Sequence, residues 1–183
     1  MKIVKDFSAL EHLNNLVNDV QSLIDKKEDF IAFIIIALGI EFLGSFYDSK
    51  SFDDYGESDT RFKNGMKLFK NNWYKNNSSW LYKQLRGPLI HQYRTGPEIY
   101  LTSNCKNNVP PDKHFIVENS KKVFVLEQFF EDFKYAVNQL KSQLKKPNNS
   151  LNKNKPMQSH LGIVELNGLG TTAASGIIWD LKK

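Results

Sequence analysis

Residues 30–40 read FIAFIIIALGI, an apolar run that follows Glu28 and Asp29 and ends at Glu41. A helix needs about 20 apolar residues to cross a bilayer, so a run of this length predicts a helix buried in a protein core. Because the run is apolar on every side, neighbouring elements must cover most of its surface. The sequence therefore predicts a mainly α fold, a helical bundle packed around a buried helix over residues 28–47.

Amphipathic helices are predicted on both sides of this buried helix. The first, over residues 8–27, opens at Ser8 on an S-x-x-E capping box and continues as a single apolar stripe. The same spacing of three and four predicts a helix over residues 126–145. An acidic loop is predicted over residues 48–60. Shorter helices are predicted after it, one over residues 61–73 and one that begins at Trp80.

Between about residues 97 and 125 the apolar spacing changes from the helical period to alternation. Ile99 and Leu101 alternate with Tyr100 and Thr102, and residues 114–118 and 123–125 flank a polar turn. Alternation of this kind on both sides of a turn is typical of two paired strands. The sequence therefore predicts a β-hairpin inserted into the helical bundle.

The last part of the chain differs in composition from the rest. Residues 146–156 are polar and contain two prolines, which predicts a flexible linker. Residues 157–183 carry two short apolar runs, and we interpret them as a C-terminal extension, either a docking tail or an added hairpin. The predicted domain is thus residues 1–145, with the hairpin inside it.

The overall composition is that of a globular chain. Apolar residues make up 40% and aromatic residues 13% of the 183 positions, which argues against general disorder. The first residues show no signal-peptide pattern, and Cys105 is the single cysteine, so no internal disulfide can form. We therefore expect a cytoplasmic location and no membrane segment. The net charge of +5 is compatible with nucleic-acid binding and equally with an ordinary polar surface.

Residues 86–93 read RGPLIHQY and match the pattern R-x4-H-x-Y. Arginine is rare in this chain, because only Arg61, Arg86 and Arg94 of the 25 basic residues are arginines. Arginine offers a planar fork that grips phosphate bidentately, as lysine cannot. His91 adds a side chain whose proton moves near neutral pH. A phosphate clamp beside a proton carrier predicts cleavage of RNA through its own 2′-hydroxyl.

With this motif late in a series of helices, the sequence resembles the HEPN superfamily of all-helical proteins. Many members are metal-independent ribonucleases of toxin–antitoxin, phage-defence and RNA-processing systems. The resemblance is closest to HEPN toxins paired with nucleotidyltransferase antitoxins, and it covers residues 8–94 and, loosely, 126–145. It implies that Arg86 binds or polarises the scissile phosphate, and that His91 is the general acid or base.

The same resemblance implies the partners and the remaining site residues. RNA would be the substrate, the chain would form a homodimer, and a nucleotidyltransferase antitoxin would silence it by attaching AMP to Tyr93. We assign Tyr93 and Arg94 to binding or modification. Gly87 stands where active members commonly carry a polar residue, so a non-catalytic HEPN-like protein-interaction module is the alternative function.

Helix geometry adds a condition to the catalytic interpretation. Five residues turn a regular helix by about 500°, so Arg86 and His91 would lie about 140° apart on one chain. Either a two-fold dimer axis or a break at Pro88 would be needed to bring them together. Pro88 predicts a kink or the start of a new helix. Alternatively, Arg86 caps a helix end and His91 satisfies a buried polar contact.

No metal or cofactor is expected. The four histidines lack the spacing of metal ligands, and a single cysteine offers no thiolate cluster.

Overall fold

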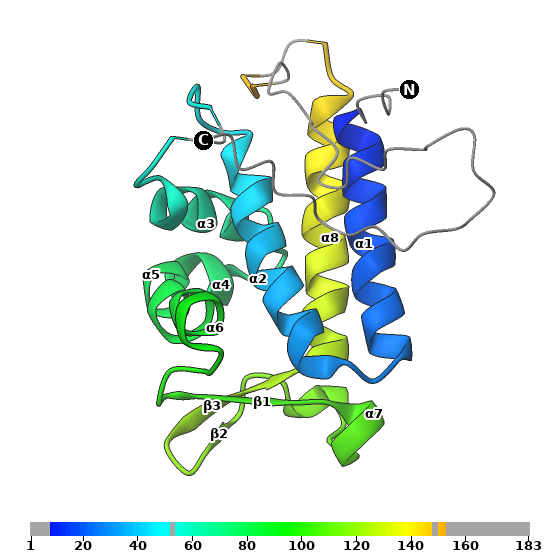
Figure 1. Cartoon of the computed structure of the whole chain (residues 1–183), viewed down its shortest axis with the longest axis vertical. Coiled ribbons are helices and arrows are strands. Elements are labelled where there is room, and N and C mark those ends of the chain that lie inside the picture. Colours follow the sequence, from blue (N-terminus) through cyan, green and yellow to red (C-terminus); the bar gives the residue numbers. More distant parts are fainter. Residues whose placement is uncertain (1–7, 52–53, 148–149, 153–183) are drawn as a thin grey trace, which may run out of the picture.

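Three long helices, α1 (Ala9–Asp25), α2 (Asp29–Ser45) and α8 (Leu126–Leu144), pack against one another along the long axis of the molecule in this computed structural model (Figure 1). Shorter helices cover the other side of α2, and a small sheet closes the end of the molecule where α2 begins. The structure describes residues 8–51, 54–147 and 150–152. The fold is mainly α, as the sequence predicts, with 63% of the described residues in helices.

Helix α1 begins where the capping box predicts. The Ser8 hydroxyl accepts the Glu11 backbone N–H at 3.2 Å, and the Glu11 carboxylate accepts the Ser8 N–H at 2.8 Å. These two bonds satisfy donors that a helix start leaves unpaired. The helix ends at Asp25, and Lys27 takes a left-handed conformation with φ of 62° that turns the chain toward α2.

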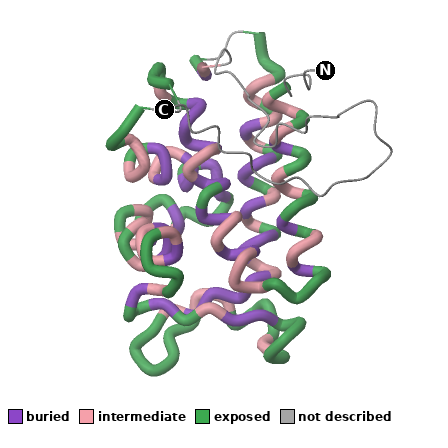
Figure 2. The backbone as a smooth tube through the Cα atoms, viewed as in Figure 1, coloured by how far each residue is buried: buried purple, intermediate pink, exposed green. Residues whose placement is uncertain are grey.

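Helix α2 is the buried helix that the apolar run predicts. Its inward faces are fully covered, and buried residues concentrate in it and in the facing sides of α1 and α8 (Figure 2). Against α3 (Ser58–Met66) the contact is backbone on backbone, because a Cβ added at Gly44 would lie 1.6 Å from the Arg61 carbonyl oxygen. Burial is not complete, since Leu38 remains 39% exposed on the outer side of the helix.

The prediction of a single helix over residues 61–73 is wrong. Helix α3 ends at Met66, and a separate short helix, α4 (Asn72–Asn76), follows a turn. Asn71 explains the break, because its side-chain oxygen accepts the Trp73 N–H at 2.9 Å and so caps the new helix. Helix α5 (Ser78–Leu81) follows directly.

A π-helical turn over Tyr82–Arg86 joins α5 to α6 (Gly87–Gln92), which contains Pro88 in its first turn. The Gly87 N–H reaches back five residues to the Tyr82 carbonyl. Pro88 has no N–H to offer the Gln84 carbonyl, and that carbonyl accepts the Gly96 N–H at 2.7 Å instead. The predicted break at Pro88 is therefore a widened turn running into a new short helix.

The inserted β-structure is larger than the predicted hairpin. Strands β2 (Val117–Glu118) and β3 (Lys121–Val125) pair antiparallel across a two-residue turn, in which Asn119 and Ser120 both have positive φ. A third strand, β1 (Ile99–Thr102), pairs parallel with β3, so the sheet order is β1-β3-β2. The connection from β1 to β2 carries α7 (Asn104–Asn107) and a 3-10 turn (Pro111–Lys113).

After α8 the description covers only part of the predicted linker. Leu151 is 8% exposed, and the Asn152 N–H donates to the Phe46 carbonyl at 2.9 Å, which ties this stretch to the end of α2. The extension predicted over residues 157–183 lies outside the described residues. Among the described helices, none combines the length and the apolar character that crossing a membrane requires.

Candidate functional site

Arg86 lies at the end of the π-helical turn, where α6 begins beside α2. The residue is only 7% exposed, and its guanidinium carbon lies 5.5 Å from the centre of the Tyr82 ring. This arginine is therefore packed inside the protein, with an aromatic face beside its charge.

Three side chains from three different elements surround the guanidinium of Arg86. Nη2 lies 2.7 Å from Glu41 Oε2 on α2 and 3.4 Å from Ser58 Oγ at the start of α3. Nη1 lies 3.3 Å from His91 Nε2 on α6. The Glu41–Arg86–His91 cluster, named by these three residues, thus holds a buried charge between a carboxylate and an imidazole.

The hydrogen bonding of this cluster is incomplete. Glu41 Oε2 and Arg86 Nε are both buried, and neither makes a hydrogen bond of good geometry among the described residues. The 2.7 Å contact between Glu41 and Arg86 is consequently an ion pair by distance whose alignment is poor. A buried donor without an acceptor costs about 1–3 kcal/mol, so this arrangement is under-satisfied.

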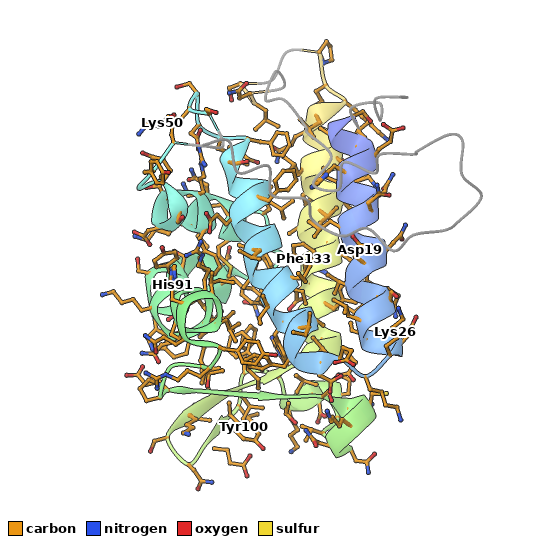
Figure 3. The ribbon with its side chains drawn as sticks, in the orientation of Figure 1. Asp19, Lys26, Lys50, His91, Tyr100 and Phe133 are labelled. Atoms are coloured by element: carbon orange, nitrogen blue, oxygen red, sulfur yellow. The ribbon has the colours of Figure 1, made fainter. Side chains whose placement is uncertain are left out.

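His91 is exposed at the surface, on the side of α2 opposite α1, which carries Asp19 and Lys26 (Figure 3). Its hydrogen bond with Arg86 fixes its protonation pattern, because a guanidinium can only donate. His91 Nε2 must therefore be the acceptor, and the neutral ring carries its proton on Nδ1. The accepting nitrogen faces Arg86.

Tyr93 and Arg94 lie beyond the cluster. Tyr93 ends α6 in a left-handed conformation with φ of 53°, is 66% exposed, and packs edge-on against Phe30 at 4.7 Å between ring centres. Arg94 is exposed and donates from Nε to the Gln92 side chain at 2.7 Å. The structure thus brings Arg86 and His91 together, and it places Tyr93 and Arg94 at the neighbouring surface.

Of the two arrangements that could bring Arg86 and His91 together, the structure shows the break at Pro88. Their side chains meet within a single chain, so no second copy is needed to join them. Glu41 and Ser58 complete the surroundings of Arg86, and neither was expected there. A signal for Glu41 exists in the sequence, because it is the one charged residue within residues 30–46 and a carboxylate in such a helix needs a partner.

A second polar cluster lies between α4, β3 and α8. The Tyr74 hydroxyl donates to Asp132 Oδ2 at 2.6 Å and lies 2.9 Å from His114 Nε2, while His114 Nδ1 accepts the Val125 N–H at 3.0 Å. Burial lowers the pKa of His114 to about 4. Burial also raises the pKa of Asp132, against the hydrogen bonds from Tyr74 and Gln128, and raises the pKa of Tyr74 well above its usual value.

Across the described residues, no group of three or more His, Cys, Asp or Glu side chains is arranged to hold a metal ion. Neither a protein-family model, nor a curated protein, nor a solved structure matches this chain. The fold and the Glu41–Arg86–His91 cluster are consequently the basis for assigning a function.

Proposed function

We propose that the chain is an HEPN-like RNA-binding protein that acts as a metal-independent endoribonuclease of a toxin–antitoxin or defence system. The observation that carries this proposal is the 3.3 Å contact between Arg86 Nη1 and His91 Nε2, with His91 exposed to solvent. The buried positive charge of Arg86 lies next to the exposed imidazole of His91, which can carry a proton. The resemblance of the R-x4-H-x-Y motif to HEPN toxins supplies the reaction class.

The proposed reaction needs these two side chains, RNA and water. The 2′-hydroxyl oxygen attacks the adjacent phosphorus, and its proton passes to His91 Nε2. The bond from phosphorus to the 5′ oxygen breaks, and that oxygen takes a proton from water, while the imidazolium later returns its proton to solvent. Arg86 stabilises the added negative charge on the phosphate oxygens. The products are a 2′,3′-cyclic phosphate and a 5′-hydroxyl.

The proposal extends to partners and location. The net charge of +5 is compatible with an anionic partner such as RNA. Tyr93, at 66% exposure, is open to RNA contact or to modification by a nucleotidyltransferase antitoxin in the cytoplasm. In the homodimer, the segments around residues 80–94, which carry Arg86 and His91, would lie near the two-fold axis. Sedimentation of the whole chain tests this last point, and a monomer at all concentrations would contradict it.

The burial of Arg86 favours a second candidate, a non-catalytic HEPN-like interaction module. At 7% exposure and paired with Glu41, Arg86 resembles an arginine that stabilises a helix junction. In this interpretation the Arg86 cluster has a structural role, and the exposed surface around Tyr93 contacts a partner protein.

Cleavage of single-stranded and looped RNA in the presence of EDTA tests the proposal. His91→Ala should reduce the rate by about two to four orders of magnitude, the usual contribution of a general acid or base. Arg86→Lys should also lose most activity, because lysine keeps the charge and loses the fork. EDTA should leave the rate unchanged, and the products should end in a 2′,3′-cyclic phosphate.

Arg61→Lys is the matched control for Arg86→Lys. Arg61 is another buried arginine, 5% exposed, whose Nε lies 2.8 Å from Asp48 Oδ2. Both substitutions should lower the melting temperature, and only Arg86→Lys should lower the cleavage rate. Wild-type protein that cuts no RNA, together with equal losses of stability in both variants, would favour the interaction module.

A further inference from the structure

The apolar helix α2 contributes one carboxylate to the site, and that carboxylate faces Arg86. Glu41 is the only acidic side chain within ion-pair distance of Arg86 among the described residues. Its side chain is 17% exposed and the side chain of Arg86 is 9% exposed, so solvent screens this pair far less than a surface pair. Glu41 is therefore in a position to set where the guanidinium lies.

We propose that Glu41 is a positioning residue that holds Arg86 against His91 Nε2, and that a phosphate of the substrate frees this nitrogen by drawing Arg86 Nη1 to itself. The inference rests on the proposed ribonuclease function. It adds a resting state, in which Arg86 Nη1 is bonded to His91 Nε2, and a step in which the substrate phosphate breaks that bond. Glu41 acts through Arg86 and does not itself touch RNA.

The resting state follows from the number of hydrogen-bonding groups on each side chain. A neutral imidazole has a single accepting nitrogen, and in this structure Arg86 Nη1 occupies it. His91 then presents only an N–H donor to solvent, at Nδ1. In this state His91 cannot take a proton from a 2′-hydroxyl, so the site is closed to catalysis until Arg86 moves.

Release follows from the relative strength of the acceptors. A phosphate oxygen carries negative charge and makes a stronger, charge-assisted bond to a guanidinium than a neutral imidazole nitrogen does. A bound phosphate can take Nη1 and leave Nε2 free to act as the base, while Glu41 keeps the rest of the fork in place.

The experiment measures the tautomer of His91 by long-range ¹⁵N NMR on the whole chain, at a pH where the ring is neutral. Free histidine in water favours the tautomer with its proton on Nε2, so a predominant Nδ1–H form would be a clear departure. We expect that departure in the wild type. We expect a mixture of tautomers in Glu41→Gln, because the amide no longer holds the guanidinium by charge.

Asp48→Asn is the matched control, since it removes the carboxylate that pairs with Arg61 and should leave the His91 tautomer unchanged. A 2′-deoxy oligonucleotide binds without being cut, and adding it should shift wild-type His91 away from the Nδ1–H form. In kinetics, Glu41→Gln should lower kcat by roughly 10- to 100-fold with little change in KM, as expected for a misplaced catalytic group. Glu41→Asp should restore part of that loss.

Two results would overturn the inference. One is wild-type His91 with its proton on Nε2, and the other is an Nδ1–H form that persists unchanged in a folded Glu41→Gln protein. Wild-type protein that cuts no RNA would overturn the ribonuclease function. The tautomer measurement needs no cleavage, and so it decides the role of Glu41 separately.

Discussion

At the scale of single residues, hydrogen bonds to both ring nitrogens determine the protonation state of His114. Its Nδ1 accepts the Val125 N–H at 3.0 Å, so the neutral ring must carry its proton on Nε2. That proton is donated to the Tyr74 oxygen at 2.9 Å, and the Tyr74 hydroxyl donates onward to Asp132. Each donor in this series of three hydrogen bonds meets one acceptor. A second proton on His114 would leave the Val125 N–H without a partner.

This arrangement predicts a loss of stability in acid. Burial lowers the pKa of His114 from 6.5 to about 4, so the unfolded state takes up the proton first as pH falls. The contribution of His114 to the free energy of unfolding is fully present above pH 6.5. It is lost as pH falls to about 4, and the loss is roughly 3 kcal/mol. Urea unfolding of the wild type at pH 7 and at pH 4.5 measures it.

His114→Phe is the control variant, because it removes the titrating group and keeps a ring in the same place. The variant should be less stable at pH 7, and its stability should fall less between pH 7 and pH 4.5 than that of the wild type. Asp132 has the opposite effect on stability, because its raised pKa makes the folded protein take up a proton first as pH falls. Asp132 is present in both proteins, so its effect does not account for a difference between them. Equal pH dependence in the two proteins would contradict the role of His114.

At the scale of elements, the π-helical turn depends on Gly96. A Cβ at this position would lie 2.1 Å from Gln84 Oε1 and 2.8 Å from Gln84 Cα, while the Gly96 N–H is bonded to the Gln84 carbonyl. Gly96→Ala must push the two segments apart, and we expect it to destabilise the protein by about 1–3 kcal/mol. Gly87→Ala, whose Cβ would meet only the Tyr82 carbonyl at 3.3 Å, should cost less in the same thermal unfolding measurement.

The same turn shows why part of the fold could be predicted and part could not. Apolar periodicity and the capping box are local signals, and they predict α1, α2 and α8 to within a few residues. The partner of the Gln84 carbonyl lies across a loop, and the pairing of β1 with β3 crosses α7 and a turn. Such contacts depend on which distant segments meet, which periodicity does not record.

The candidate site also contains residues that the sequence predicts and residues that it does not. The motif predicts Arg86 and His91 because their residue types carry the chemistry. On a regular helix they would lie apart, and they meet here because Pro88 follows a widened turn and the long arginine side chain reaches the imidazole. Glu41 comes from a helix that the apolar run marks as core. Its role depends on how α2 packs beside α6.

At the scale of the whole molecule, residues 150–152 bear on how much of the chain the core requires. Leu151 is 8% exposed and belongs to the hydrophobic core, although its segment was predicted to be a linker. The Asn152 N–H donates to the Phe46 carbonyl at 2.9 Å, and its side-chain amide donates to the Asp48 carbonyl at 3.3 Å. These bonds tie residue 152 to carbonyls at and just beyond the end of α2.

We therefore expect a chain ending at Asn152 to be more stable than one ending at Pro147. Burial of a leucine side chain contributes about 1.5–3 kcal/mol, and each hydrogen bond adds about 1 kcal/mol. Urea unfolding of the two truncated chains should give the longer chain the higher free energy of unfolding, by less than the sum of these gains, because the entropy lost on ordering the segment opposes them. Leu151→Ser in the longer chain is the control and should remove most of the difference. Equal stability of the two chains, with no exchange protection at the Asn152 amide, would support the original linker prediction.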